Sequence, residues 1–183
     1  MTIENLSLRM VRPHLGDIPQ YELPAPYRFR MFQPGDADTW VAIQGAADKL
    51  SKISHHLFDR QFGSDLEAMP QRSFFICNPQ GEAIGNATAW YKEYEGEIVG
   101  RVHWVAVVPE YQGRGLSKPL MTAVMNRLAE LHDRAILDTA TPRLVAIKVY
   151  LDFGFLPDMR NDEDRRAWLL VRRRLDHRTL RTL

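Results

Sequence analysis

The sequence predicts a mixed α/β domain whose central sheet is mostly antiparallel, with six to seven strands and about four helices on its two faces. Three observations predict it. Residues 72–108 read as strands separated by turn residues, which is typical of an antiparallel meander. Residues 102–132 run from an apolar strand through a glycine loop into an amphipathic helix. Another apolar run at 135–139 follows that helix, so the crossover makes its strand parallel to the one before.

The beginning of the chain carries weaker signals than its middle. Residues 1–26 are expected to form an extension ahead of a main domain that covers residues 27–183. Residues 5–11 alternate weakly and predict an edge strand. Four prolines make the rest of the extension an extended arm. This arm would either cover the domain or contact a second subunit.

The main domain opens with a strand and two helices. Residues 27–32 alternate as its first strand, and Asp36 stands where it would cap a helix containing Trp40. A second helix is expected around residues 57–62. The meander then follows, and Gly85 is a candidate for a β-bulge within it.

The last third of the chain predicts one more helix and two more strands. The helix places Ala146, Tyr150 and Phe153 on one stripe and ends at Gly154. Residues 155–159 read as a short strand, and residues 161–175 as a charged turn followed by a last strand that would form a hairpin with it.

The glycine loop at residues 112–117, Gln-Gly-Arg-Gly-Leu-Ser, predicts an anion site. Glycines let consecutive backbone N–H groups point into one cavity, and the positive end of the following helix adds to the attraction. Arg114 and Lys118 supply charge nearby. The loop is not a P-loop, because no Gly-Lys-Ser/Thr follows, and Lys118 stands where a dinucleotide fingerprint needs its third glycine.

Two motifs resemble the GNAT family of acyltransferases. Gln112 and Gly115, preceded by a strand that ends in Val107 and Pro109, are similar to the family's motif A. Ala146, Tyr150 and the Gly154-Phe155 pair are similar to its motif B, at the family's order and separation. The resemblance covers about residues 28–175. It implies a GNAT fold, with a central sheet splayed where the cofactor binds.

The resemblance also implies the cofactor, acetyl-CoA, and the residues that hold it. Backbone groups of the loop would bind the pyrophosphate, and backbone groups of the preceding strand would pair with the pantetheine arm. The Val107 N–H would also stabilise negative charge on the reacting carbonyl oxygen. The expected cofactor residues are Val105, Val107, Gln112, Gly113, Arg114, Gly115, Leu116 and Ser117.

Tyr150 and His103 are the expected catalytic residues. Tyr150 matches the motif B tyrosine that donates a proton to the coenzyme A sulfur in relatives, although a core tyrosine would look the same. A strict alternation places His103 on the strand face of Val105 and Val107, and its ordinary pKa suits a general base; the alternative is a packed strand histidine. Glu97 and Asp138 are weaker candidates for the base.

Composition narrows the setting of the protein. A net charge of +1 implies no attraction to nucleic acid, and no apolar run is long enough to span a membrane. The single cysteine, Cys77, excludes an internal disulfide and favours the cytoplasm. No metal site is expected. Nothing in the sequence separates a monomer from a homodimer.

The predicted activity is acetyl-CoA-dependent N-acetyl transfer to a primary amine, by direct attack in a ternary complex. The acceptor, a small molecule or a peptide, is not specified by the sequence. The alternative is a non-catalytic acyl-CoA-binding regulatory module with the same fold. A nucleotide-binding α/β protein is disfavoured, because an antiparallel meander precedes the loop where a βαβ unit would be expected.

Overall fold

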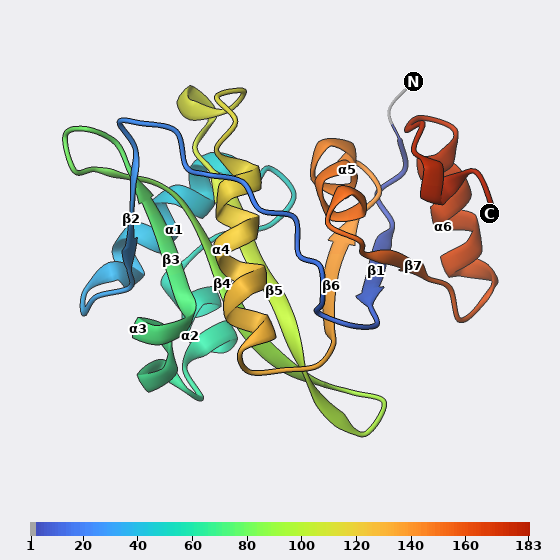
Figure 1. Cartoon of the computed structure of the whole chain (residues 1–183), viewed down its shortest axis with the longest axis horizontal. Coiled ribbons are helices and arrows are strands. Elements are labelled where there is room, and N and C mark those ends of the chain that lie inside the picture. The colour runs from blue at the N-terminus through green and yellow to red at the C-terminus, as the bar shows by residue number, and fades with distance from the viewer. Residues whose placement is uncertain (1–2) are drawn as a thin grey trace.

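The computed structural model describes residues 3–183, which form one seven-stranded sheet with six α-helices (Figure 1). The strands lie in the order β2-β3-β4-β5-β6-β1-β7, and only β5 and β6 pair in parallel. Their bounds are β1 Ser7–Arg12, β2 Arg28–Met31, β3 Ser73–Cys77, β4 Ala83–Tyr94, β5 Glu97–Val107, β6 Ala135–Ala140 and β7 Leu156–Asp158. The predicted fold class is confirmed.

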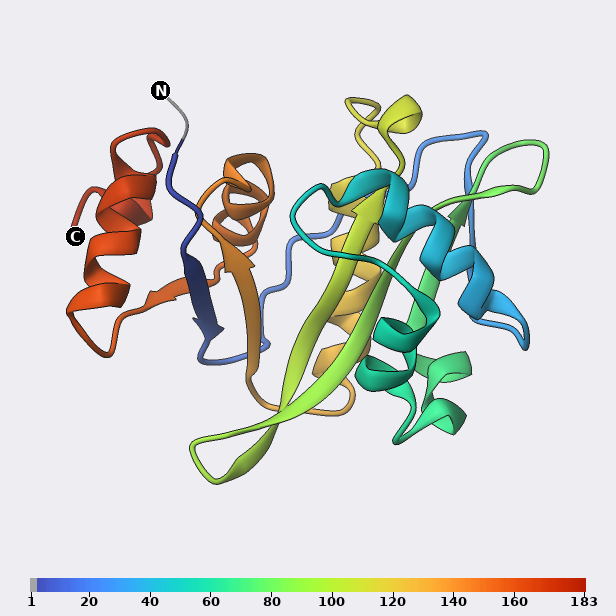
Figure 2. The same ribbon diagram turned by 180° about the vertical axis from the view of Figure 1, so that it is seen from behind.

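The helices cover both faces of the sheet. Their bounds are α1 Asp36–Ala47, α2 His55–Phe62, α3 Met69–Arg72, α4 Ser117–Ala129, α5 Leu144–Asp152 and α6 Asp162–Arg172. Buried residues of α4, α5 and α6 share one large core on one side of the sheet, whereas α1 and α2 pack on the other side around Trp40 and Phe62. In Figure 2, which views the molecule from the opposite side, α1 and α2 lie in front of the sheet.

Strand β1 lies inside the sheet, so the expected edge strand at residues 5–11 was placed wrongly. It pairs with β6 along Ser7–Arg12 and with β7 through Arg9–Val11, both antiparallel. Two buried side chains, Leu8 and Met10, join the large core from this strand. Residues 1–2 of the predicted extension lie outside the described part, and the division at residue 26 stays a prediction.

The arm after β1 covers α4, one of the two alternatives left open by the sequence. Figure 1 shows this blue segment crossing α4. Thr122 of α4 donates to the Pro19 carbonyl at 2.9 Å and accepts from the Tyr21 N–H at 3.2 Å, while Gln20 bonds Asn126. The arm is therefore tied to the helix that begins at the glycine loop.

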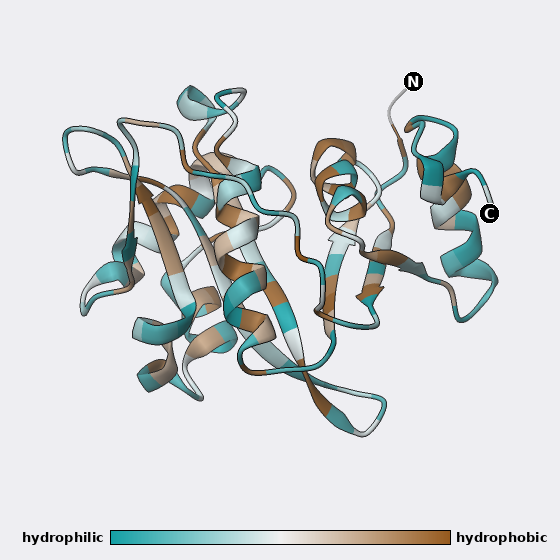
Figure 3. Cartoon of the chain, viewed as in Figure 1, coloured by the Kyte–Doolittle hydropathy of each residue, from teal (hydrophilic) through white to brown (hydrophobic). Residues whose placement is uncertain are grey.

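The last predicted strand is wrong, because residues 162–172 form helix α6. Asn161 caps this helix by accepting from the Asp164 N–H. Three acidic residues in the first turn stabilise the helix, because their negative charges interact favourably with the positive end of the helix dipole. Ala167, Trp168 and Val171 are buried at helical spacing. Figure 3 accordingly shows α6 with both hydrophilic and hydrophobic residues. The short strand β7 exists, but its partner is β1.

Two other local predictions have mixed outcomes. Gly35, not Asp36, occupies the cap of α1, since Asp36 lies in the first turn and pairs with Arg30 at 2.5 Å. The expected bulge near Gly85 is confirmed, because the register of β3 and β4 shifts where Ile76 pairs with Gly85 and Cys77 with Ala83.

Strands β5 and β6 separate soon after they meet. They pair only at Gly100–Ala135 and Arg101–Ile136. Further along β5, a second register shift against β4 leaves one extra residue in β5, and Trp104 there has a φ of 51°. From the residue after Arg101 onward, β5 no longer pairs with β6, so the edge of β5 that would face a parallel neighbour has none among the described strands.

Candidate active site

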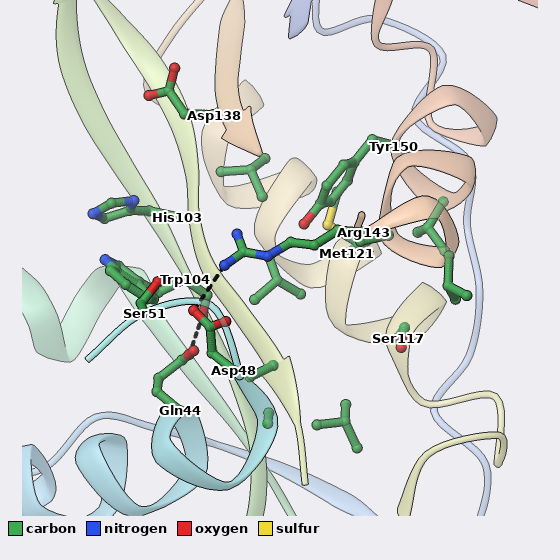
Figure 4. A pocket seen from close by; sticks show the side chains of 18 of the residues that line it. Gln44, Asp48, Ser51, His103, Trp104, Ser117, Met121, Asp138, Arg143 and Tyr150 are labelled. Carbon is green, nitrogen blue, oxygen red and sulfur yellow. Dashed lines mark hydrogen bonds and ion pairs between the residues drawn. The ribbon is translucent and has the colours of Figure 1, made fainter. Parts of the chain in front are cut away.

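A cleft of about 850 Å³ opens where β5 and β6 diverge. Residues 101–107 of β5 form its floor. One wall comes from the C-terminal end of α1 and the segment after it, and the other from the residues between β6 and α5 and from α5 itself. Figure 4 shows side chains from these segments facing one another across β5.

The glycine loop ends at one end of this cleft, and Gln112, Gly113 and Ser117 line it. Gly113 and Gly115 have φ angles of 74° and 76°, in the left-handed region that favours glycine. A Cβ at either position would meet no heavy atom within 4 Å. Within residues 3–183, no hydrogen bond engages the backbone N–H of Gly113, Gly115, Leu116 or Ser117. The loop therefore offers free donors at the start of α4, as an anion cradle requires.

The side chains of three other predicted cofactor residues contact other parts of the protein. The Gln112 side chain donates to the Val107 carbonyl at 2.9 Å and so ties the loop to β5. The Arg114 guanidinium donates to the Tyr27 hydroxyl and the Glu110 carbonyl and lies 4.7 Å from the Tyr111 ring centre. Leu116 is buried in the core. A cofactor contact from Leu116 would have to come from its backbone, whereas exposed Arg114 keeps free side-chain donors.

The edge of β5 at Val107 that was predicted to bind pantetheine is free of a strand partner among the described residues. The Val108 N–H donates to Ile84 on β4, so the alternation of strand groups points Val107 toward the opposite edge, beside the cleft. Val105 and Val107 both line the cleft. Gln112 already occupies the Val107 carbonyl, which leaves the Val107 N–H as the free group of that residue.

Tyr150 projects from α5 into the same cleft (Figure 4). It is half-buried, and its hydroxyl forms no hydrogen bond within the described chain. Burial raises the pKa of Tyr150 to about 12, and the nearby Arg143 charge opposes part of that rise. The phenol therefore stays protonated at neutral pH, as a proton donor must.

His103 does not share a face with Val105 and Val107, so the strict alternation predicted for this strand is wrong. The bulge at Trp104 interrupts it. Val105 and Val107 pack against the core of α4, whereas the His103 ring lies 5.5 Å from Phe62 of α2. Figure 4 shows His103 and Trp104 on the side of β5 away from Tyr150.

His103 is a poor candidate for a general base. Burial, and then the charges of Arg101 and Lys92, lower its pKa well below the usual 6.5. Its Nε2 atom is buried and has no hydrogen-bond partner within residues 3–183. An imidazole with so low a pKa is neutral at pH 7 but accepts a proton weakly. The packed strand histidine, the alternative left open by the sequence, describes this geometry better.

Acid should destabilise the protein through His103. Its pKa is lowered in the folded state, so below about pH 6.5 the unfolded chain binds the extra proton and the free energy of unfolding falls. We expect His103→Gln to flatten the pH dependence of urea unfolding between about pH 5 and 7. The exposed His56, replaced in the same way, is the control. Equal slopes in wild type and His103→Gln would contradict this account.

An ion pair joins the two walls of the cleft. Arg143, just before α5, lies 2.8 Å from Asp48, the residue after α1 (Figure 4). Gln44 of α1 donates to the Trp104 carbonyl at 2.8 Å and to Asn86 at 3.0 Å, which holds the bulge in place. Sequence reasoning missed both Gln44 and Asp48, because neither the bulge that Gln44 holds nor the pairing of Asp48 with the distant Arg143 leaves a local signal in the sequence.

Within residues 3–183, no group of three or more His, Cys, Asp or Glu could hold a metal ion. No described helix is both long and apolar enough to cross a membrane.

Solved structures define the class of fold. A GCN5-related N-acetyltransferase from Sphaerobacter thermophilus superposes with a TM-score of 0.69 at 18% identity, over 86% of this chain and 50% of that one. Glucosamine-6-phosphate N-acetyltransferase from Arabidopsis thaliana has a TM-score of 0.52 at 17% identity, over 74% of this chain and 92% of that one. At such identities the likeness concerns the fold alone.

Sequence comparison identifies the family. The model of the acetyltransferase (GNAT) family matches residues 39–155. Mycothiol acetyltransferase from Streptomyces griseus subsp. griseus is 33% identical over 159 residues, which cover 81% of this chain and 50% of that protein. The protein of that name from Thermobispora bispora is 30% identical over 162 residues, 85% of this chain and 55% of that protein. The chain belongs to the GNAT family and spans about half the length of these curated relatives.

Proposed function

We propose that the chain transfers an acetyl group from acetyl-CoA to a primary amine by direct attack in a ternary complex. One observation carries the proposal: free loop amides, a free strand edge and a protonated tyrosine all border one cleft. Gly113, Gly115 and Ser117 would hold the pyrophosphate through their N–H groups. Val105 and Val107 would pair with the amides of the pantetheine arm.

The chemistry needs few groups from the protein. Acetyl-CoA supplies an activated acyl group. The amine nitrogen uses its lone pair to form the C–N bond, the C–S bond breaks, and the Tyr150 hydroxyl gives its proton to the departing sulfur. The Val107 N–H would stabilise negative charge on the carbonyl oxygen. The proton lost by the amine returns to Tyr150 through solvent, so protons balance over one turnover.

No titratable residue that lines the cleft in the described part of the chain is well suited to act as the general base. His103 titrates too low, and both carboxylates that line the cleft, Asp48 and Asp138, are engaged by arginines. This favours a mechanism in which the acceptor arrives as a neutral amine. The same observation favours the second candidate, a non-catalytic acyl-CoA-binding module, because binding alone needs no base.

Calorimetry and a turnover assay test both candidates. Titration with acetyl-CoA and with free coenzyme A should release heat from a single site. No heat at high micromolar protein would contradict both proposals, because each requires the cradle. Release of free thiol in the presence of amines distinguishes them: turnover supports the transferase, and saturable binding without turnover on a broad amine panel supports the binding module.

For the acceptor we propose only a chemical class, and for the location of the protein only a compartment. The curated relatives are named for mycothiol, which supports a small-molecule amine as the acceptor class. The single cysteine, Cys77, is buried and unpaired, which supports a reducing, cytoplasmic setting.

A further inference from the structure

The end of the cleft far from the glycine loop contains a cluster of cations around one carboxylate. Asp138 of β6 accepts from Arg9 at 2.8 Å and from Arg101 at 2.9 Å, and Lys92 approaches to 3.5 Å. The three cations come from β1, β5 and β4. Figure 4 shows Asp138 and Ser117 at opposite ends of the labelled side chains, with Arg143 and Tyr150 between them. The cluster therefore lies where an acceptor, rather than the cofactor pyrophosphate, would enter.

The positive charge of this cluster exceeds its negative charge. Three cations share the single carboxylate of Asp138, whose pKa they hold below its usual value although burial acts against them. The neighbouring carboxylates Asp158 and Glu95 offset part of this charge from outside the cleft, because neither lines it and both pair with Arg160, at 2.9 Å and 2.8 Å. Asp164 accepts from the Arg160 backbone N–H.

The hydrogen-bonding capacity left in the cleft belongs to donors. Asp48 is occupied by Arg143 and by the Leu50 N–H, each at 2.8 Å, and Asp138 is occupied as described. Neither carboxylate is left to receive an ammonium group. Arg101 has five N–H donors but uses only Nη2, and its Nε is buried without a partner within residues 3–183. An anionic ligand could accept from the remaining Nη donors of Arg101, which are not buried, whereas the buried Nε lies out of reach of a ligand and a cationic ligand would find no acceptor there.

We propose that the acceptor amine carries an anionic group, a carboxylate or a phosphate, which binds at Arg101 with help from Lys92. This inference rests on the proposed acetyltransferase function. Arg101 is the residue of the cluster that lines the cleft together with Asp138, whereas Arg9 and Lys92 border the neighbouring hollow that Asp138 also lines. A substrate would therefore extend from Tyr150 toward Asp138, with its amine at the Tyr150 end.

Acceptors paired by the presence or absence of one anionic group test this proposal, with rates referred to the concentration of neutral amine, because the anion also raises the pKa of the amine. Glycine against glycinamide gives the carboxylate arm, and O-phosphoethanolamine against ethanolamine gives the phosphate arm. The readout is kcat/KM from thiol release. In at least one arm the acid should exceed its neutral partner by about tenfold or more, since a charge-assisted hydrogen bond in a partly exposed site gives that order of preference. The arm with the larger ratio identifies the anion.

Three variants assign the preference to Arg101. Arg101→Gln should bring the acid-to-neutral ratio close to one while the Kd for acetyl-CoA stays unchanged, and Arg101→Lys should restore part of the ratio. Arg9→Gln removes the other strong partner of Asp138 but leaves the cleft lining intact, and it should keep the wild-type ratio. A structural role for the cluster would instead make both glutamine variants behave alike.

The proposal has outcomes that overturn it. The acidic-acceptor proposal is overturned if the neutral amine matches or exceeds its acidic partner in both arms. It is also overturned if Arg101→Gln leaves the acid-to-neutral ratio unchanged. Either result leaves the acetyltransferase function standing. Failure to bind acetyl-CoA would instead remove the proposed function itself. If acetyl-CoA binds but no amine of either arm is acetylated, the acidic-acceptor proposal is overturned for both anions.

Discussion

Tyr150→Phe is expected to lower kcat by about 10²–10⁴-fold, the usual contribution of a positioned general acid. The substitution removes one hydroxyl from a residue that borders the cleft and forms no hydrogen bond within the described chain, so the fold should tolerate it. The Kd for acetyl-CoA should change little, because the loop and the β5 edge are untouched. Steady-state kinetics and calorimetry measure the two quantities.

The pH profile adds a second readout for Tyr150. Since burial raises its pKa to about 12, kcat/KM of the wild type should show no alkaline loss from this residue near pH 10. Tyr21→Phe is the matched control, because Tyr21 lies on the arm over α4 and its ring, rather than its hydroxyl, contacts Lys118. Turnover in Tyr150→Phe equal to that of the wild type would exclude the proton-donor role.

Gly115→Val should weaken acetyl-CoA binding by about 100-fold or more. A β-branched residue strongly disfavours the φ of 76° found here, so the loop would leave its present conformation. Losing two amide–phosphate bonds of about 1.5 kcal/mol each gives a factor of this size. A side chain at this position would meet open space, so the effect is one of backbone conformation rather than of a clash.

The hairpin between β4 and β5 provides the matched control. Gly96 has a φ of 81° and the same open surroundings, but it lies outside the cleft. Gly96→Val should therefore cost stability of the same order, about 1–2 kcal/mol, without changing the affinity for acetyl-CoA. Thermal unfolding and calorimetry of the two variants separate the effects. If Gly115→Val bound acetyl-CoA like the wild type, the loop would not be the cradle.

Local chemistry made the centre of the fold predictable. The apolar strand, the glycine loop and the helix from Ser117 each depend on residues that are neighbours in the chain. The sequence also carried the signal for α6, since Asn161 and the three acidic residues after it are typical of a helix start. The run at 167–171 resembled a strand because Leu169 and Leu170, which lie outside the buried face of Ala167, Trp168 and Val171, are apolar as well.

The errors at the site come from long-range structure. One extra residue at Trp104 moves His103 to the other face of the sheet, and the bulge is held by Gln44 from a helix far back in the chain. No local pattern around residue 104 predicts this. The pairing of Asp48 with Arg143 depends likewise on how two distant helix ends meet across the cleft. The Tyr150 position could be predicted because the helical period and the motif agree there.

The place of β1 has a consequence for biosynthesis. Both of its neighbours, β6 and β7, come from the last third of the chain, so β1 is made long before either and has no partner until residues 135–140 of β6 have left the ribosome. The nascent chain must keep the apolar side chains of Leu8 and Met10 from other contacts during that interval. Closing a loop of this length is slow relative to hairpin formation. We therefore expect the β6-β1-β7 edge to be completed last, after the β2–β5 meander has folded.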